Sequence, residues 1–142
     1  MKKEYTQRTA RLIGQEKVDE LNNKKVLVFG VGGVGSAVVE ALGRAGVGHL
    51  ILVDADVFDP SNLNRQLGAT VETIGRPKVE VMKERLLTIN PDIDVETHAT
   101  FYLPESHEGF IAKSGADYVV DAIDTTSAKI AIIDEAYRSE EH

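Results

Sequence analysis

The residues Gly30-Val31-Gly32-Gly33-Val34-Gly35 form a glycine-rich motif of the type GxGxxG. The motif follows an apolar segment and precedes a run of helix formers, which is the context in which it binds a nucleotide. Glycines let the backbone approach a phosphate, and the start of a helix offers unpaired N–H groups to it. We therefore predict nucleotide binding by four glycines: Gly30, Gly32, Gly33 and Gly35. The alternative is that these glycines only permit tight packing of a helix on a strand.

Asp54 ends the next apolar segment, close to the spacing of about 20 residues at which a carboxylate accepts both ribose hydroxyls. These two features alone would favour an NAD-dependent oxidoreductase. However, 22 residues separate Asp54 from Pro77, and connections this long inside compact domains are usually functional. Amides and cations in and just after this connection suit a triphosphate better than a hydride carrier: Asn62, Asn64, Arg65, Gln66 and Lys78. A solvated polar surface is the alternative for the connection.

The segments around these motifs alternate between predicted strands and helices. Strands are predicted at 26–29, 49–53, 93–99 and 118–120, and helices at 36–44, 77–89, 104–113 and from 125 or 126 to about 137. No element is predicted over 55–75. The first two strands are continuous apolar runs, typical of strands buried on both faces. The alternation predicts an α/β fold: a Rossmann-like, doubly wound, mainly parallel sheet with helices on both faces.

Composition restricts the class of protein. The chain has 142 residues, of which 42% are hydrophobic and 27% charged, as in an ordinary globular domain. It has no cysteine, which excludes disulfides, thiolate zinc sites and cysteine nucleophiles. No apolar run approaches the ~20 residues that span a bilayer. We therefore predict a cytoplasmic protein with no membrane segment in this chain.

Charge is distributed unevenly along the chain. Residues 1–25 hold seven Lys or Arg against four Asp or Glu, whereas residues 26–142 hold nine against nineteen. We predict an N-terminal helical arm over 1–24 and a nucleotide-binding domain over 25–142. The basic arm suits an anionic ligand, and a solvated amphipathic helix explains its charge equally well.

Taken in order, several passages resemble the ThiF/MoeB superfamily, whose adenylation fold is shared with ubiquitin-activating enzymes. They are the glycine motif, Val53-Asp54-Ala55-Asp56, Ser61-Asn62-Leu63-Asn64-Arg65-Gln66, Gly75-Arg76-Pro77-Lys78 and Asp121-Ala122-Ile123-Asp124. The match extends over nearly the whole chain. It implies use of ATP and Mg²⁺ to adenylate a carboxylate, with release of pyrophosphate.

The resemblance also implies roles for individual residues in the nucleotide site. Asp54 matches the ligand of the ribose. The other nucleotide and phosphate ligands match residues in and after the long connection: Asn62, Arg65, Gln66 and Lys78. Of these, Arg65 and Lys78 are expected to be catalytic, because their charge would stabilise negative charge that develops on the phosphates.

Two further catalytic residues are implied by the resemblance. Asp124 matches the aspartate of the Mg²⁺ site, whereas its neighbour Asp121 has either a functional or a structural role. Arg8 lies in Gln7-Arg8-Thr9-Ala10-Arg11-Leu12-Ile13-Gly14, which resembles the arm whose arginine enters the active site of the partner subunit. This implies a homodimer with exchanged arms. Arg11 is the competing candidate, and surface solvation is the alternative for both arginines.

Within the superfamily, some passages resemble the tRNA threonylcarbamoyladenosine dehydratases, among them Lys78-Val79-Glu80-Val81-Met82 and Phe101-Tyr102-Leu103-Pro104-Glu105. This implies that the activated carboxylate belongs to a modified adenosine at tRNA position 37, which is then cyclised with loss of water. Ser61-Asn62-Leu63 is more like enzymes that adenylate the C-terminal glycine of a ubiquitin-like sulfur carrier. The superfamily's C-terminal region is missing from the sequence, so we expect either a truncated chain or an unusually short member. A non-catalytic ATP-binding fragment is therefore a third alternative.

Overall fold

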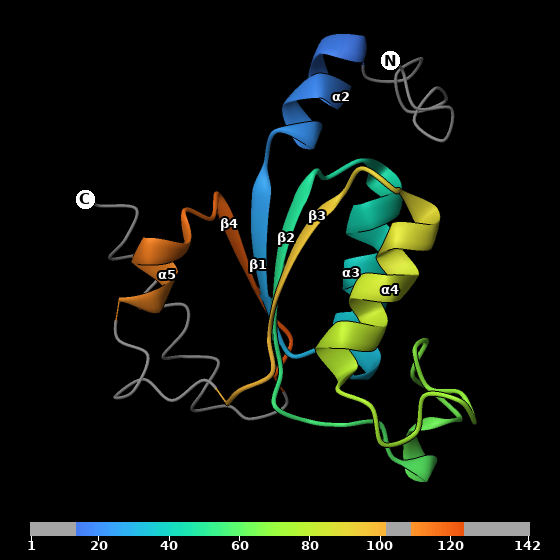
Figure 1. Cartoon of the computed structure of the whole chain (residues 1–142). Helices are drawn as coiled ribbons and strands as arrows, with labels where there is room; N and C mark the ends of the chain where they lie inside the picture. Colours follow the sequence, from blue (N-terminus) through green and yellow to red (C-terminus); the bar gives the residue numbers. More distant parts are fainter. Residues whose placement is uncertain (1–13, 102–108, 124–142) are drawn as a thin grey trace.

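The computed structural model describes residues 14–101 and 109–123 (Figure 1). The elements in chain order are α2 (Gln15–Asn22), β1 (Lys25–Phe29), α3 (Gly33–Ala45), β2 (His49–Val53), the 3₁₀ helix η2 (Pro60–Asn62), α4 (Lys78–Ile89), β3 (Asp94–His98), α5 (Phe110–Ser114) and β4 (Tyr118–Asp121). The four predicted strands and the helices at 36–44 and 77–89 are confirmed, with ends shifted by up to a few residues. The helix predicted beyond 125, and much of the one predicted at 104–113, lie outside the described residues.

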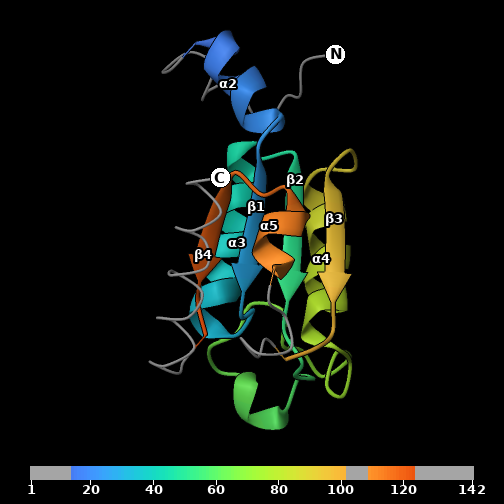
Figure 2. The same cartoon turned by 90° about the vertical axis from the view of Figure 1, so that its left-hand side faces the viewer.

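The four strands form one parallel sheet in the order β3-β2-β1-β4. Helices α3 and α4 cover one face of this sheet and α5 lies against the other (Figures 1 and 2). The predicted α/β fold, with a parallel sheet between helices, is confirmed.

Side chains of the central strand alternate between two cores. Val26 and Val28 of β1 pack with residues of α3 and α4, whereas Leu27 and Phe29 pack on the opposite face with Ile111 of α5. These four side chains of β1 are at most 4% exposed. Burial on both faces explains why the segment is a continuous apolar run rather than an alternating one.

Helix α2 contacts the rest of the chain at the turn between α3 and β2. The N–H of Gly48 donates to Leu21 O at 3.4 Å, and a Cβ added at Gly48 would lie 1.8 Å from Asn22 O. The described part of the predicted N-terminal arm is thus the helix α2, which contacts the turn that leads into β2. Residues 1–13, which include Arg8, lie outside the described residues. None of the helices in the described part of the chain is a candidate membrane span.

The carboxyl ends of the strands meet at the edge of the sheet opposite α2, where the connection from β2 to α4 also lies (Figure 1). The chain moves from β1 to β2 and β3 in one direction, and β4 then pairs on the other side of β1. In open parallel sheets, ligands bind outside the carboxyl ends where the strand order reverses in this way. The glycine motif follows β1 directly at this point.

Candidate nucleotide-binding site

Two glycines of the motif are required by packing alone. Gly30 has a φ of 89°, and a Cβ there would lie 2.8 Å from the carbonyl oxygen of Ala122, just after β4. A Cβ on Gly35, in the first turn of α3, would lie 1.7 Å from Gly30 O. The tight-packing interpretation therefore accounts for Gly30 and Gly35, whatever the site binds.

Packing does not account for the other two glycines. The nearest atom to a Cβ on Gly32 would be Gln66 Nε2 at 3.6 Å, and the nearest to one on Gly33 would be Arg65 O at 4.0 Å. These are ordinary or looser contacts, so the described residues leave room for a side chain at both positions. Gly32 and Gly33 lie at the N-terminus of the 13-residue helix α3. Because these glycines have no side chain to cover the backbone there, a phosphate can approach it closely.

The carboxylate of Asp54 is fixed beside this loop by two backbone donors. Oδ2 accepts a hydrogen bond from the N–H of Val31 at 2.8 Å, and Oδ1 accepts one from the N–H of Asp56 at 2.7 Å. Asp54 itself is half-buried. Each carboxylate oxygen can accept more than one hydrogen bond, so the group can still receive the two hydroxyls of a ribose.

The connection between β2 and α4 is folded rather than a loose polar surface, and it contains the unpredicted helix η2. Asn62 is 6% exposed, and its Oδ1 accepts the N–H of Asp59 at 2.9 Å while Asp59 Oδ1 accepts the N–H of Ser61 at 2.9 Å. This reciprocal capping gives Asn62 a structural role within η2. The structure therefore supplies a local reason for Asn62 besides the predicted one.

Gln66 and Arg65 bring this connection against the glycine motif. Gln66 is 7% exposed, and its Oε1 has no hydrogen-bond partner among the described residues. Its Nε2 is the atom nearest to a Cβ on Gly32, at 3.6 Å, so the side-chain amide lies beside the glycine motif, and a buried polar atom without a partner, such as Oε1, is uncommon in folded proteins. Arg65 is exposed, and its Nη1 donates to Ser61 O at 2.9 Å and to Asn64 Oδ1 at 3.4 Å.

Lys78 is the first residue of α4 and is placed by the far end of the same connection. Its N–H donates to Asp56 O at 3.0 Å, and the preceding Pro77 forms an isolated antiparallel bridge with Val57. The side chain is only 6% exposed, and its Nζ lies 5.8 Å from the centroid of the Phe58 ring. In the described part of the chain, Lys78 is in no ion pair.

Neighbouring arginines, by contrast, are neutralised. Arg76 makes a two-pronged ion pair with Glu84, with N–O distances of 2.9 and 2.8 Å. Arg85 of α4 pairs with Glu40 of α3, and Arg44 lies 3.6 Å from the same carboxylate. The hydrogen bond from Arg85 lowers the pKa of Glu40, so that this acid remains charged between two arginines. Of Arg65, Arg76 and Lys78, the cations in and just after the connection, only Arg76 has an acidic partner among the residues that the structure describes.

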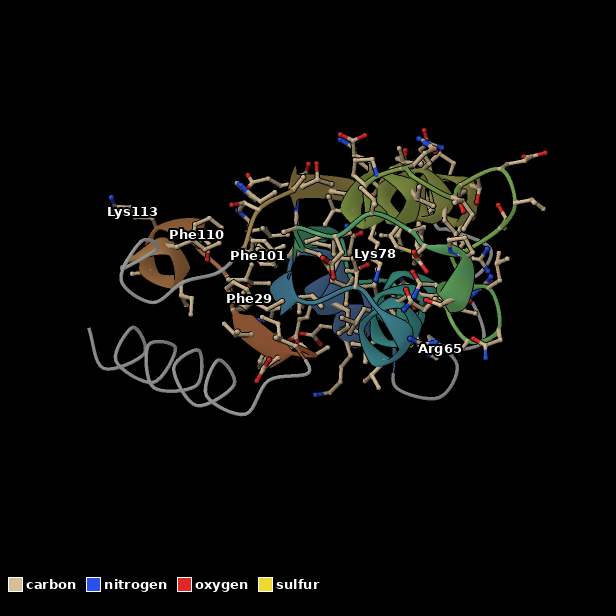
Figure 3. All side chains as sticks on the ribbon, turned by 90° about the horizontal axis from the view of Figure 1, so that it is seen from below. Phe29, Arg65, Lys78, Phe101, Phe110 and Lys113 are labelled. Atoms are coloured by element: carbon tan, nitrogen blue, oxygen red, sulfur yellow. The ribbon has the colours of Figure 1, made fainter. Side chains whose placement is uncertain are left out.

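Figure 3 looks onto this edge of the sheet. Lys78 lies near the middle of the view and Arg65 on the α3 side of it, whereas Phe29, Phe101 and Phe110 lie toward α5. Several features together fit a nucleotide with several phosphates: room over Gly32 and Gly33, the held carboxylate of Asp54, the side-chain amide of Gln66, and Lys78, which has no ion-pair partner among the described residues.

The predicted metal ligand Asp124 lies outside the described residues. Its neighbour Asp121 is half-buried, and its Oδ1 accepts the N–H of Ile123 at 3.0 Å, which holds the turn after β4. Within 14–101 and 109–123, no group of three His, Asp or Glu side chains could hold a metal ion. The Mg²⁺ site therefore stays a prediction.

Comparison with known proteins gives the family. The model of the ThiF family matches residues 5–141. The chain belongs to the ThiF family. It is 48% identical over 126 residues to a tRNA threonylcarbamoyladenosine dehydratase of Bacillus subtilis, covering 89% of this chain and 49% of that protein. It is 38% identical over 118 residues to the sulfur carrier protein ThiS adenylyltransferase of Escherichia coli, covering 83% of this chain and 45% of that protein.

Solved structures also show similarity to a tRNA threonylcarbamoyladenosine dehydratase. The crystal structure of E. coli tRNA N6-threonylcarbamoyladenosine dehydratase superposes with a TM-score of 0.91 at 37% identity, over 96% of this chain and 56% of that one. A structure of the same enzyme in complex with ATP has a TM-score of 0.89 at 38% identity, over 94% of this chain and 54% of that one. The ThiF-family chain thus spans about half the length of these relatives.

The sequence patterns did not single out Phe58, which the structure of this ThiF-family chain places beside Lys78. Phe58 is 1% exposed and lies beneath Lys78, yet it is a lone aromatic residue in a polar connection with no periodic pattern. An isolated large apolar residue in such a segment is itself a signal, because it indicates that the segment is anchored to a core.

Proposed function

We propose that this chain forms the nucleotide-binding part of an ATP-dependent tRNA threonylcarbamoyladenosine dehydratase. The observation that carries the proposal is the pairing of Gly32 and Gly33, which packing does not require, with a buried lysine that is in no ion pair within residues 14–101 and 109–123. The 48% identity to the B. subtilis dehydratase supports the choice of substrate. A tRNA substrate would place the activity in the cytoplasm.

In the proposed reaction the carboxylate of the threonylcarbamoyl group attacks the α-phosphate of ATP, and pyrophosphate leaves. The activated carbonyl carbon is then attacked from within the same group, and AMP leaves, so that the net change in the tRNA is loss of water. No protein nucleophile is needed, in keeping with a chain that has no cysteine. Positioning and charge stabilisation are the protein's main contributions.

Each site residue has a proposed part in this chemistry. Asp54, held by Val31 and Asp56, would accept the ribose hydroxyls. Lys78 and Arg65 would bind the phosphates and stabilise the charge of the departing pyrophosphate. Gln66 would contact the ligand through its side-chain amide, whose Nε2 lies beside Gly32.

Two parts of the proposal rest on residues outside the described ranges. Asp124 would bind Mg²⁺, which when bound neutralises phosphate charge. Arg8 would enter the site of the second subunit of a homodimer through an exchanged arm. Both remain proposals drawn from the resemblance of the sequence motifs.

Exchange of labelled pyrophosphate into ATP tests the proposed function. We expect exchange with tRNA that carries threonylcarbamoyladenosine and none with the same tRNA lacking the modification. Exchange that depends instead on a ubiquitin-like carrier ending in Gly-Gly would favour the second candidate, which the 38% identity to the ThiS adenylyltransferase supports. ATP binding without exchange in either case would indicate a nucleotide-binding part that does not react alone, and absence of ATP binding would refute the proposal.

A further inference from the structure

Phe58 is the residue that closes the connection between β2 and α4. Its N–H donates to Arg76 O at 3.0 Å, and its carbonyl oxygen accepts the N–H of Gly75 at 2.8 Å. Phe58 therefore joins the first part of the connection to Gly75 and Arg76, and Arg76 lies two residues before the start of α4. Any shift of Phe58 is transmitted directly to the segment that carries Lys78.

The ring of Phe58 is held in place on several sides. It packs with Ala69 and Val81 in a small core, separate from those of the sheet, and is 1% exposed. A Cβ added at Gly68 would lie only 2.6 Å from the ring atom Cζ, so the backbone of the connection closes tightly over it. The ring is thus a fixed surface rather than a mobile cover.

The ammonium group of Lys78 lies over this fixed surface. Its Nζ is 5.8 Å from the ring centroid, within the range at which the negative face of an aromatic ring attracts a cation. Asp59 is the nearby acid on the same connection, but its carboxylate caps η2 through Ser61. The pKa of Asp59 is lowered chiefly by its hydrogen bonds from Ser61, with a smaller contribution from the charge of Lys78.

An aromatic partner and an acidic partner would affect ligand binding in opposite ways. A carboxylate would accept hydrogen bonds from the ammonium group and would have to be displaced by a phosphate. A ring face attracts the charge but takes up none of the three strong N–H donors. Lys78 is therefore held in place by the ring, and none of its ammonium donors is taken up by an acid of the described ranges.

We propose that Phe58 is a positioning residue that holds the charged side chain of Lys78 ready for the phosphates of the nucleotide. The proposal rests on the proposed function, because it takes phosphate as the ligand of Lys78. It differs from a role in packing alone, since packing would be served equally by any apolar side chain of similar size.

A double-mutant cycle separates these two roles, with calorimetric binding of inorganic pyrophosphate and of ATP as the readout. The proteins compared are the unmodified chain, Phe58→Leu, Lys78→Met and the double variant. We expect Phe58→Leu to weaken pyrophosphate binding by about three- to thirtyfold where Lys78 is present, the range of a cation–π interaction. In the Lys78→Met background, the same substitution should change affinity by less than about twofold.

Val81→Ala is the matched control, because Val81 belongs to the same small core but is not part of the ring–ammonium contact. It should loosen the connection without changing pyrophosphate affinity. If Phe58→Leu does not fold, as judged by circular dichroism, Phe58→Met provides a second non-aromatic variant of closer volume.

Four outcomes would overturn the inference. An equal loss from Phe58→Leu in both backgrounds, or an equal loss from Val81→Ala, would mean that Phe58 only packs the connection. Unchanged affinity in Phe58→Leu would mean that the ring does not matter. If the unmodified chain binds neither ATP nor pyrophosphate, the proposed function fails, and this inference fails with it.

Discussion

The carboxylate of Asp54 accepts a hydrogen bond of 2.8 Å from the backbone N–H of Val31, which lies 23 residues earlier in the chain. This contact ties the end of β2 to the middle of the glycine motif after β1. It uses one oxygen of a carboxylate whose other oxygen is held by the N–H of Asp56. The group predicted to bind the ribose is thus fixed relative to the backbone predicted to bind the phosphates.

Replacing Asp54 with alanine should weaken ATP binding while leaving pyrophosphate binding nearly unchanged. The variant removes the acceptor of the ribose hydroxyls, and hydrogen bonds to a charged group contribute about 1.5–3 kcal/mol, equivalent to roughly ten- to a hundredfold in affinity. Calorimetric titration with each ligand measures the difference. If both ligands lose affinity by the same factor, Asp54 acts only by holding the glycine motif.

The four glycines should separate into two classes on substitution by alanine. Gly33→Ala should leave the free energy of unfolding unchanged or raise it by up to about 1 kcal/mol, because alanine favours the helical conformation and the nearest atom to its Cβ is 4.0 Å away. ATP affinity should nevertheless fall by about tenfold or more, since the methyl group occupies the space proposed for phosphate.

Gly35→Ala is the contrasting variant. Its Cβ would lie 1.7 Å from Gly30 O, so the variant should be destabilised by roughly 3 kcal/mol or more through overpacking. Urea denaturation gives both free energies of unfolding, and titration gives the ATP affinity of Gly33→Ala. If the Gly33→Ala protein folds and binds ATP with unchanged affinity, Gly33 is not part of the phosphate-binding site.

The same glycines show what sequence patterns could and could not predict. Strand β1 and its burial followed from the continuous apolar run 26–29, because parallel strands with both faces covered have that composition. The start of α3 was predicted three residues late, at Ser36, since glycine disfavours helices. The close approach of Gly35 to Gly30, a tertiary contact, overrides that local preference.

The sequence indicated a functional role for the connection between β2 and α4, but the conformation of this connection could not be predicted from it. Its shape depends on hydrogen bonds between distant backbone groups, such as Phe58 to Arg76, which no periodic pattern reveals. The sequence also could not show that Lys78 has no ion-pair partner among the described residues, because ion pairs between separate segments depend on the tertiary structure. The structure pairs Glu84 with Arg76, for example.

Complementation between variants tests the predicted exchange of arms. If Arg8 acts in the partner's site, mixing the Arg8→Ala and Asp124→Ala proteins should restore up to about a quarter of the wild-type activity, because half of the dimers are then mixed and each has one intact site. Each variant should be inactive alone. The measurement is pyrophosphate exchange after subunit exchange has been verified, and failure to recover activity would place Arg8 in its own subunit's site or outside any site.

The ion pair between Glu40 of α3 and Arg85 of α4 should make stability depend on pH. The pKa of Glu40 is lowered from 4.5, first by the hydrogen bond from Arg85 and further by the charges of Arg85 and Arg44. A group with a lowered native pKa stabilises the fold fully above its unfolded pKa and loses that contribution as pH falls through the native value. Glu40→Gln should therefore lower the free energy of unfolding by about 0.5–1 kcal/mol at pH 7, and the difference from the unmodified chain should vanish in acid.

Glu72→Gln is the matched control for this pH dependence. Glu72 is exposed and, within the described part of the chain, is in no ion pair. Urea denaturation of the three proteins between pH 7 and strong acid measures the effect. The pair couples the two helices that begin with Gly33 and Lys78, so a pH-dependent difference confined to Glu40→Gln would identify it as a stabilising contact between them. A constant difference at every pH would mean that the substitution acts through packing rather than through the charge of Glu40.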